Sequence, residues 1–285
     1  MSKPSDARRK RSVGQFVASG DWSDYWTTRI SQAEKGKIRV RGYPVEELIE
    51  HLTYTEAAFL LIQGELPDDR EAALFDLALR SGMDQEFVNS AACAARFTAS
   101  AFPDSVVPGL ASGLLASGSV TGSPQEPAEM LIEAVAWNKP DGEAARAAVD
   151  LWLGRRAHVP GLGHPMHKEA EPRAVALRRV ALARDGWRAH GRMLDAIEAD
   201  VASRKKRKIP INLAGAIGAL LADLGFDPLA IGGLGALSYG MSVLAHVVEE
   251  IREGVPLRII PRELGARYKG PEERHLPAEK KESRR

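Results

Sequence analysis

Val159-Pro-Gly-Leu-Gly-His-Pro-Met-His-Lys-Glu-Ala-Glu-Pro-Arg173 is the stretch that organises the chain, because it separates segments with helical character by a dense polar turn. It holds two glycines, three prolines and two histidines. The glycines beside Leu162 allow left-handed backbone and a close approach to a ligand. Lys168 and Arg173 can place positive charge near that ligand. We interpret the stretch as a binding turn centred on His164; the alternative is a helix connector whose histidines are solvated.

Composition limits the class of protein. The chain has 285 residues, of which 44% are hydrophobic, and a formal net charge of +1. This length allows one large domain, or a large and a small one, around a substantial core. No apolar run reaches the roughly 20 residues that cross a bilayer, so we expect a soluble protein without a membrane partner. The balanced charge gives no sign of nucleic-acid binding.

Cys93 is the single cysteine. It excludes an intramolecular disulfide and a multi-cysteine zinc site, and it suits a reducing compartment, so we predict a cytoplasmic location. No His-x-x-x-His or paired acidic sequence suggests a metal site, and neither a dinucleotide fingerprint nor a Walker sequence is present. We therefore predict no metal ligands and no permanently bound cofactor.

Helical periodicity dominates the chain and predicts an all-α fold. Apolar residues of 45–52 share one helical face after Pro44, and Thr53 and Gly64 are expected to begin and end the next helix. Short strands or a structured arm are expected within 22–38. Further helices are predicted at about 67–80, 88–100, 105–117, 125–137, 143–153, 173–187, 191–203, 212–224, 229–234 and 237–252.

Two segments are strongly basic. Met1–Ser12 is not followed by the apolar core of a signal peptide, and we interpret it as part of a disordered tail. Arg204-Lys-Lys-Arg-Lys208 ends a predicted helix. These cations are either a solvated helix end near the negative pole of the helix dipole or an anion site for a phosphate-bearing ligand.

Motifs in order along the chain resemble the citrate synthase family, and within it the short citryl-CoA lyase branch and the lyase module of ATP-citrate lyase. One is Glu34-Lys-Gly-Lys-Ile-Arg-Val-Arg-Gly-Tyr-Pro-Val-Glu-Glu-Leu48, followed by Gly64-Glu-Leu-Pro67. Another is the Gly-Leu-Gly-His segment within 160–168 with Glu171-Pro-Arg173 after it, and a third is Ala245-His-Val-Val-Glu-Glu250. The short length favours the lyase branch.

The resemblance implies a homodimer, or a higher homo-oligomer, in which a large helical domain and a small one enclose the active site. After the disordered basic tail, expected at 1–20 from its composition, it places the N-terminal part of the large domain at 21–155 and the small domain at 156–235. A return helix to the large domain follows at 236–262, and a charged tail at 263–285.

The resemblance also implies carbon–carbon bond formation or cleavage between an acyl-CoA and a 2-oxo acid, such as citryl-CoA to acetyl-CoA plus oxaloacetate. A coenzyme A thioester is then a substrate, together with a di- or tricarboxylate. His164 matches the histidine that polarises the oxo acid. The remaining matches are Arg173, His246 and Arg96 for substrate carboxylates, and Lys205, Lys206 and Lys208 for the phosphates of coenzyme A.

The sequence departs from the family at four positions. Ala214 stands where the base aspartate is expected in Asn212-Leu-Ala-Gly215. Thr121 stands for the enol-stabilising histidine and Gln85 for another histidine of the lyase branch, so these two take the matching catalytic positions. Met241 stands for a late arginine.

Two functions remain open. The first is an active lyase or synthase whose base is Asp84, Glu86 or the substrate itself. The second is a catalytically impaired homologue that binds coenzyme A thioesters or carboxylates as a regulatory or partner subunit, because three polar catalytic positions differ at once. His167 is interpreted as a loop histidine in both.

Overall fold

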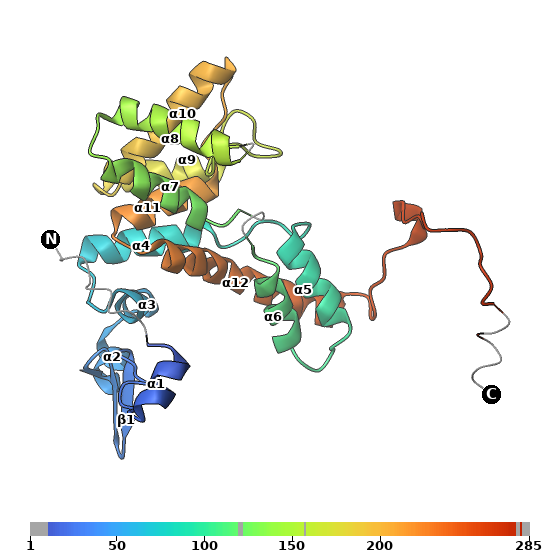
Figure 1. Cartoon of the computed structure of the whole chain (residues 1–285), viewed down its shortest axis with the longest axis horizontal. Coiled ribbons are helices and arrows are strands. Elements are labelled where there is room, and N and C mark those ends of the chain that lie inside the picture. The colour runs from blue at the N-terminus through green and yellow to red at the C-terminus, as the bar shows by residue number, and fades with distance from the viewer. Residues whose placement is uncertain (1–10, 119–121, 157, 278–279, 281–285) are drawn as a thin grey trace. The chain divides into compact units, whose positions relative to one another are not determined.

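The computed structural model describes residues 11–118, 122–156, 158–277 and 280, and they are mostly helical (Figure 1), which confirms the predicted class. The helices of the first half are α1 (Val13–Ser19), α2 (Val45–His51), α3 (Tyr54–Gln63), α4 (Asp69–Ser81), α5 (Ser90–Ser100) and α6 (Val107–Leu115). Those of the second half are α7 (Gln125–Ala136), α8 (Asp141–Arg155), α9 (Pro172–Ala183), α10 (Ala189–Lys205), α11 (Leu213–Asp223), α12 (Pro228–Glu253) and the short 3-10 helix η2 (Arg262–Leu264).

The chain divides into two compact units. Unit 1 comprises Met1–Ser81 and Pro124–Leu234, and unit 2 comprises Gly82–Ser123 and Gly235–Arg285. The predicted boundary after residue 235 lies close to one between these units, whereas the predicted boundary between 155 and 156 falls inside unit 1. The assignment of a large and a small domain stays a prediction.

A three-stranded antiparallel sheet precedes α2, within and just after the region where strands were expected. It consists of β1 (Ser31–Glu34), β2 (Lys37–Val40) and β3 (Tyr43–Pro44), in that order. The register pairs Ser31 with Val40 and Arg39 with Pro44. Most of its side chains are exposed.

Local signals set the boundaries of α3, as predicted. Thr53 is its N-cap and forms a capping box with Glu56: the hydroxyl accepts from the Glu56 N–H, and the Glu56 carboxylate accepts from the Thr53 N–H. Gly64 ends the helix at φ 89°, a conformation that costs glycine little.

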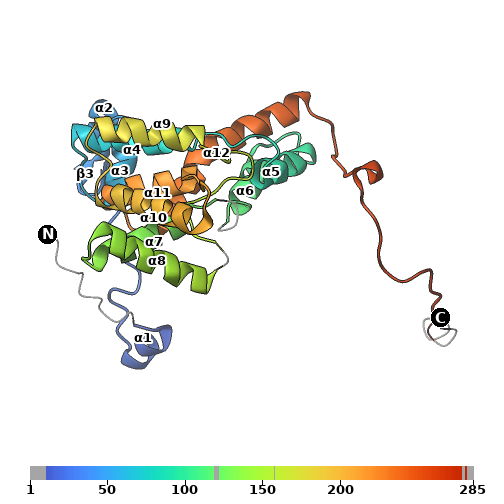
Figure 2. The same cartoon turned by 90° about the horizontal axis from the view of Figure 1, so that it is seen from above.

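The core of unit 1 surrounds α11, which contacts α4, α7, α9 and α10 (Figures 1 and 2). From Gly215 to Ala222 every residue of this helix is buried. Its alanines and glycines allow neighbouring backbones to approach closely, since a Cβ on Gly218 would lie 2.8 Å from the Pro124 carbonyl oxygen. Three aromatic rings, of Phe59, Phe75 and Phe226, pack together at the side of this core.

Unit 2 packs α5 and α6 against the C-terminal part of α12 through small residues. Ala91, Ala92, Ala95 and Ala99 of α5 are buried, so the expectation that this alanine-rich segment lies inside a bundle is confirmed. A Cβ on Gly113 of α6 would lie 2.5 Å from the Val243 side chain. Close helix packing therefore requires these small side chains.

The prediction of two helices at 229–234 and 237–252 is wrong, because α12 is continuous from Pro228 to Glu253. Gly232 leaves room for Gln125, since a Cβ on it would lie 2.7 Å from Gln125 Oε1. Over an eighteen-residue window α12 has a mean hydropathy of 1.5, with 33% of that window buried. By length and composition alone it could cross a membrane, as many core helices of globular proteins could, so the expectation that no apolar run is long enough is also wrong.

Candidate active site

The His164 loop is held against the segment before α11 by backbone pairing. Gly163 N–H donates to the Pro210 carbonyl at 2.7 Å, and Asn212 N–H donates to the Gly161 carbonyl at 3.0 Å. Between these bonds Leu162 and Ile211 form an isolated antiparallel bridge. The loop needs glycine on both sides of Leu162, since Gly161 and Gly163 have φ values of 81° and 82°.

Two glycines bring the loop and α11 into backbone contact. A Cβ on Gly215 would lie 2.4 Å from the Gly161 carbonyl oxygen and 2.8 Å from the Gly161 Cα. No side chain fits in this space, so the position of the loop depends on Gly215 as well as on its own glycines.

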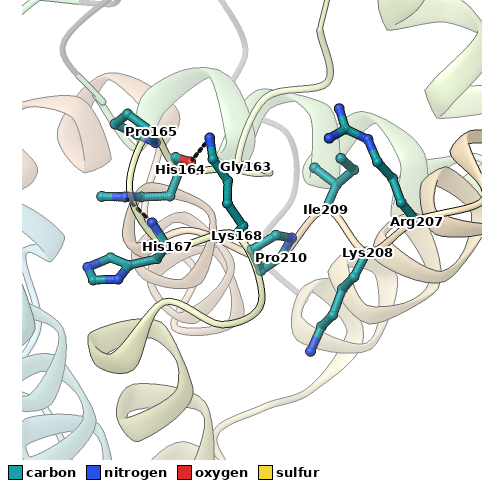
Figure 3. Close-up of a pocket in the computed structure, with 9 residues that line it drawn as sticks. All are labelled: Gly163, His164, Pro165, His167, Lys168, Arg207, Lys208, Ile209 and Pro210. Carbon is teal, nitrogen blue, oxygen red and sulfur yellow. Dashed lines mark hydrogen bonds between the residues drawn. The ribbon is translucent and has the colours of Figure 1, made fainter.

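The ring of His164 is oriented by its own loop (Figure 3). Its Nδ1 accepts from the backbone N–H of His167, which Figure 3 draws, and from that of Met166, both at 3.2 Å. The Lys168 ammonium donates to the His164 carbonyl at 3.1 Å. Because Nδ1 is an acceptor, the neutral ring carries its proton on Nε2. His164 is therefore a hydrogen-bond donor through Nε2–H, suited to a carbonyl or carboxylate oxygen.

Burial of the half-buried ring is the main cause that lowers the pKa of His164 below its usual 6.5. The nearby ring of His167 and the cations of Arg173 and Lys168 lower this pKa further. Glu171 opposes them by its negative charge. His164 is consequently neutral at pH 7, in agreement with the hydrogen bonds at Nδ1.

This pKa predicts a pH dependence of stability. Since the pKa of His164 is lower in the folded chain, its neutral form contributes to the free energy of unfolding above pH 6.5, and this contribution is lost as the pH falls through the folded pKa. The free energy of unfolding of the wild type, less that of His164→Gln, is expected to shrink between about pH 7 and pH 5. Urea denaturation at each pH measures it, and a difference that grows on acidification would contradict the assignment.

A pocket of about 370 Å³ opens beside His164 (Figure 3). The His164 loop forms one side, and Arg207 and Lys208 line it from the segment that follows α10. Neither Lys205 nor Lys206 is among the lining residues, although both were predicted to bind coenzyme A. Lys205 is the last residue of α10, and Lys206 is its C-cap at φ 50°. The left-handed turn at Lys206 separates the helix from Arg207 and Lys208.

Arg173 is oriented by the carboxylate two residues before it. Its Nε donates to Glu171 Oε1 at 2.7 Å, and Glu171 Oε2 accepts from the Ala174 N–H at 2.7 Å, which caps α9. The Glu171 side chain is completely buried. Burial raises the pKa of Glu171, but the bonds from Arg173 and Ala174 N–H outweigh it and keep the pKa below its usual value. Glu171 is thus an ionised anchor for Arg173 rather than a proton acceptor.

Among the described residues, unit 2 contains three of the other predicted site residues. Arg96 forms ion pairs of 2.7 Å with Glu249 and with the buried Glu250. Glu250 also binds the guanidinium of Arg258. The cationic group predicted to bind a substrate carboxylate is therefore neutralised by two carboxylates of α12.

His246 and Gln85 lie at a second polar cluster of unit 2. Asp84 Oδ1 accepts from the Ser242 hydroxyl at 2.7 Å and lies 3.4 Å from His246 Nε2. Burial raises the pKa of Asp84, yet these bonds and the N–H groups of Gln85 and Glu86 lower it overall. The predicted residues are thus grouped around Asp84, which holds the loop before α5 against α12.

Thr121, Ala214 and Met241 are the remaining positions at which the sequence departs from the family. Thr121 lies outside the described residues. Ala214 occupies the first turn of α11, immediately before Gly215, and Met241 is 63% exposed. No group of three potential metal ligands occurs among the described parts of the chain. Sequence reasoning included Arg207 only as a member of the basic run and singled out its lysines. It missed the role of Asn212, although Asn212 three residues before Gly215 is a recognisable cap signal.

Comparisons with known proteins agree with the fold. The family model described as citrate synthase, C-terminal domain, matches residues 24–82 and 67–261. Citrate synthase 1 of peroxisomes from Arabidopsis thaliana is 52% identical over 46 residues, which are 16% of this chain and 10% of that protein. A 2-methylcitrate synthase of Mycobacterium tuberculosis is 45% identical over 51 residues, 17% of this chain and 13% of that protein. The matched segments thus span only a small part of these relatives.

Solved structures match over nearly the whole chain. Citryl-CoA lyase from Hydrogenobacter thermophilus superposes with a TM-score of 0.82 at 28% identity, covering 90% of this chain and 99% of that one. ATP citrate lyase from Methanothrix soehngenii, in complex with citrate and coenzyme A, gives 0.75 at 20% identity, covering 95% of this chain and 46% of that one. Its likeness concerns the fold. With its helices, its glycine-flanked histidine loop and a family match across most of its length, this chain belongs to the citrate synthase family.

Proposed function

We propose that this protein binds a coenzyme A thioester and a 2-oxo acid, or the adduct of the two, and makes or cleaves the carbon–carbon bond between them as a citryl-CoA lyase does. One observation carries the proposal: the loop presents His164 as a neutral donor through Nε2–H, in a pocket that Arg207 and Lys208 make positive. The likeness to a citryl-CoA lyase at 28% identity supports it.

The donor suits the charge that develops in this reaction. In the direction of synthesis, the enolate of the thioester attacks the carbonyl carbon of the oxo acid, and the electron pair of the C=O bond moves to oxygen. A preorganised N–H stabilises that oxygen more in the transition state than in the ground state. In cleavage the hydroxyl of the adduct first loses its proton to water or to a carboxylate of the substrate. The alkoxide then becomes a carbonyl, and the bonding pair returns to the enolate, which takes up a proton at carbon. His164 serves as this donor in both directions.

Arg207 and Lys208 provide charge for the phosphates of the thioester. Replacing Lys208 with alanine is expected to weaken acetyl-CoA binding by about three- to fivefold at low salt, and by less at about 0.5 M salt, because exposed charges are screened. Isothermal titration calorimetry measures the affinity. Lys139→Ala is the matched control, since Lys139 is exposed and pairs with Glu143 at 3.0 Å. Equal weakening in both variants would contradict a local role for Lys208.

The test of the proposed function is the cleavage of citryl-CoA. The protein is incubated at high concentration with citryl-CoA, and oxaloacetate is followed by its reduction with malate dehydrogenase. Product at a rate proportional to protein concentration supports the proposal. Absence of product from citryl-CoA and from related hydroxyacyl thioesters would overturn it.

A binding protein is the second candidate, and Ala214 favours it. This residue brings no carboxylate to the first turn of α11, and no aspartate or glutamate occurs among the described residues that line the pocket. A protein of this kind binds acetyl-CoA, citrate or oxaloacetate without turnover. Calorimetry with the three ligands, combined with the cleavage assay, separates the candidates: binding without product favours the second.

A further inference from the structure

Asn212 joins the His164 loop to α11 through both ends of its side-chain amide. Its Oδ1 accepts from the Gly215 N–H at 3.0 Å and so caps α11. Its Nδ2 donates to the Gly163 carbonyl at 3.0 Å. That carbonyl belongs to the peptide bond directly before His164. The amide therefore fixes the plane of the peptide from which the catalytic-loop histidine extends.

Only an amide performs both tasks at this position. An aspartate retains the cap but presents an oxygen to the Gly163 carbonyl, where two acceptors repel. A serine retains a cap acceptor but places its single hydroxyl at the helix end. The backbone bond from Asn212 N–H to the Gly161 carbonyl is independent of the side chain and remains in either variant.

The position of the Gly163–His164 peptide determines what the ring can do. The imidazole reaches the N–H groups of Met166 and His167 only if the turn after His164 keeps its geometry. Those bonds hold the proton on Nε2, because an acceptor at Nδ1 favours the neutral ring protonated at the other nitrogen. If this peptide rotates, the turn loosens, and neither the tautomer of His164 nor the direction of its Nε2–H is fixed any longer.

We infer that Asn212 is a positioning residue for His164: its amide sets the orientation in which Nε2–H meets the carbonyl oxygen of a 2-oxo acid. The substrate in this inference rests on the proposed function, whereas the effect on His164 itself does not.

The test compares Asn212→Ser and Asn212→Asp with the wild type by two measurements. The first is the NMR titration of the His164 Cε1–H signal in the ligand-free protein, assigned with His164→Gln. The bonds that Nδ1 accepts favour the neutral ring, so their loss is expected to raise the midpoint toward the usual 6.5. The second is the affinity for oxaloacetate by calorimetry, expected to fall by about tenfold in both variants, the effect of one misplaced hydrogen bond to a charged ligand. The serine variant decides the titration, because the new charge of aspartate raises the midpoint by itself.

Thr53→Ala is the control for the loss of a helix cap. Thr53 caps α3 in the same unit, where its partner is Glu56. It is expected to lower the melting temperature without moving the His164 titration or the oxaloacetate affinity. A wild-type titration midpoint in folded Asn212→Ser would overturn the positioning role. If the wild type binds no oxaloacetate, the proposed function fails, and the titration still decides the role of Asn212.

Discussion

Replacement of His164 by alanine is expected to reduce the cleavage of citryl-CoA by about 100- to 1,000-fold, the effect of removing one preorganised donor to a developing oxyanion. The loop holds Nδ1 on two backbone N–H groups, so Nε2–H is fixed before any substrate arrives. The expected loss lies mainly in kcat, because the donor acts most strongly on the charge of the transition state. Steady-state kinetics with citryl-CoA measures it.

His51→Ala is the matched control for this prediction. His51 is an exposed histidine of α2 in the same unit, next to Glu50. Its replacement is expected to leave the rate within about twofold, because surface substitutions away from special features have small effects. A rate in His164→Ala within about threefold of the wild type would show that His164 is not the donor. In a binding protein the same change would instead reduce oxaloacetate affinity while acetyl-CoA affinity, which we propose depends on Arg207 and Lys208, persists.

Replacement of Gly215 by alanine is expected to lower the free energy of unfolding by about 1–3 kcal/mol, the usual range for an atom forced into packed space. The new Cβ would lie 2.4 Å from the Gly161 carbonyl oxygen, and backbone on both sides resists displacement. The greater helix propensity of alanine, about 1 kcal/mol, offsets only part of this. Because Gly161 belongs to the His164 loop, oxaloacetate affinity is expected to fall as well. Urea denaturation and calorimetry measure the two effects.

Gly142→Ala makes the same chemical change without the contact. Gly142 lies in α8 with no atom within 4 Å of a Cβ placed on it. Alanine there is expected to raise the free energy of unfolding by about 0.4–1 kcal/mol, since it restricts the unfolded chain. Equal stability changes in the two variants would show that the Gly161–Gly215 contact does not limit the residue at 215.

Local signals in the sequence were reliable for the fold. Thr53 and Gly64 begin and end α3 because capping and left-handed backbone depend on residues within one turn. The break predicted between 234 and 237 was wrong, because α12 runs through these residues without interruption. Gln125, far away in sequence, lies against Gly232, where a Cβ would meet its side chain. Helix propensity, which depends on local sequence, cannot predict a contact between residues so far apart in the chain.

At the candidate site, too, sequence patterns did not reveal which groups the charged side chains contact. The charge of Arg96 suggested a carboxylate ligand, but its partners are Glu249 and Glu250, more than 150 positions later in the chain. The basic run suggested lysines for coenzyme A, yet the left-handed C-cap at Lys206 leaves Arg207 and Lys208 at the pocket.

By itself the sequence determined the helical class, the family and the turn centred on His164, because periodicity, caps and the glycines beside Leu162 act over a few residues. The three-dimensional structure decided which ring nitrogen of that histidine carries the proton and which residues lie around it. The tautomer of His164 follows from two backbone N–H groups, and the position of its peptide follows from Asn212 and from the contact between Gly161 and Gly215. The bonds at Nδ1 lie within the loop itself. The contacts of Asn212 and Gly215 join segments about fifty residues apart, and their geometry exists only once α11 and the loop have packed together.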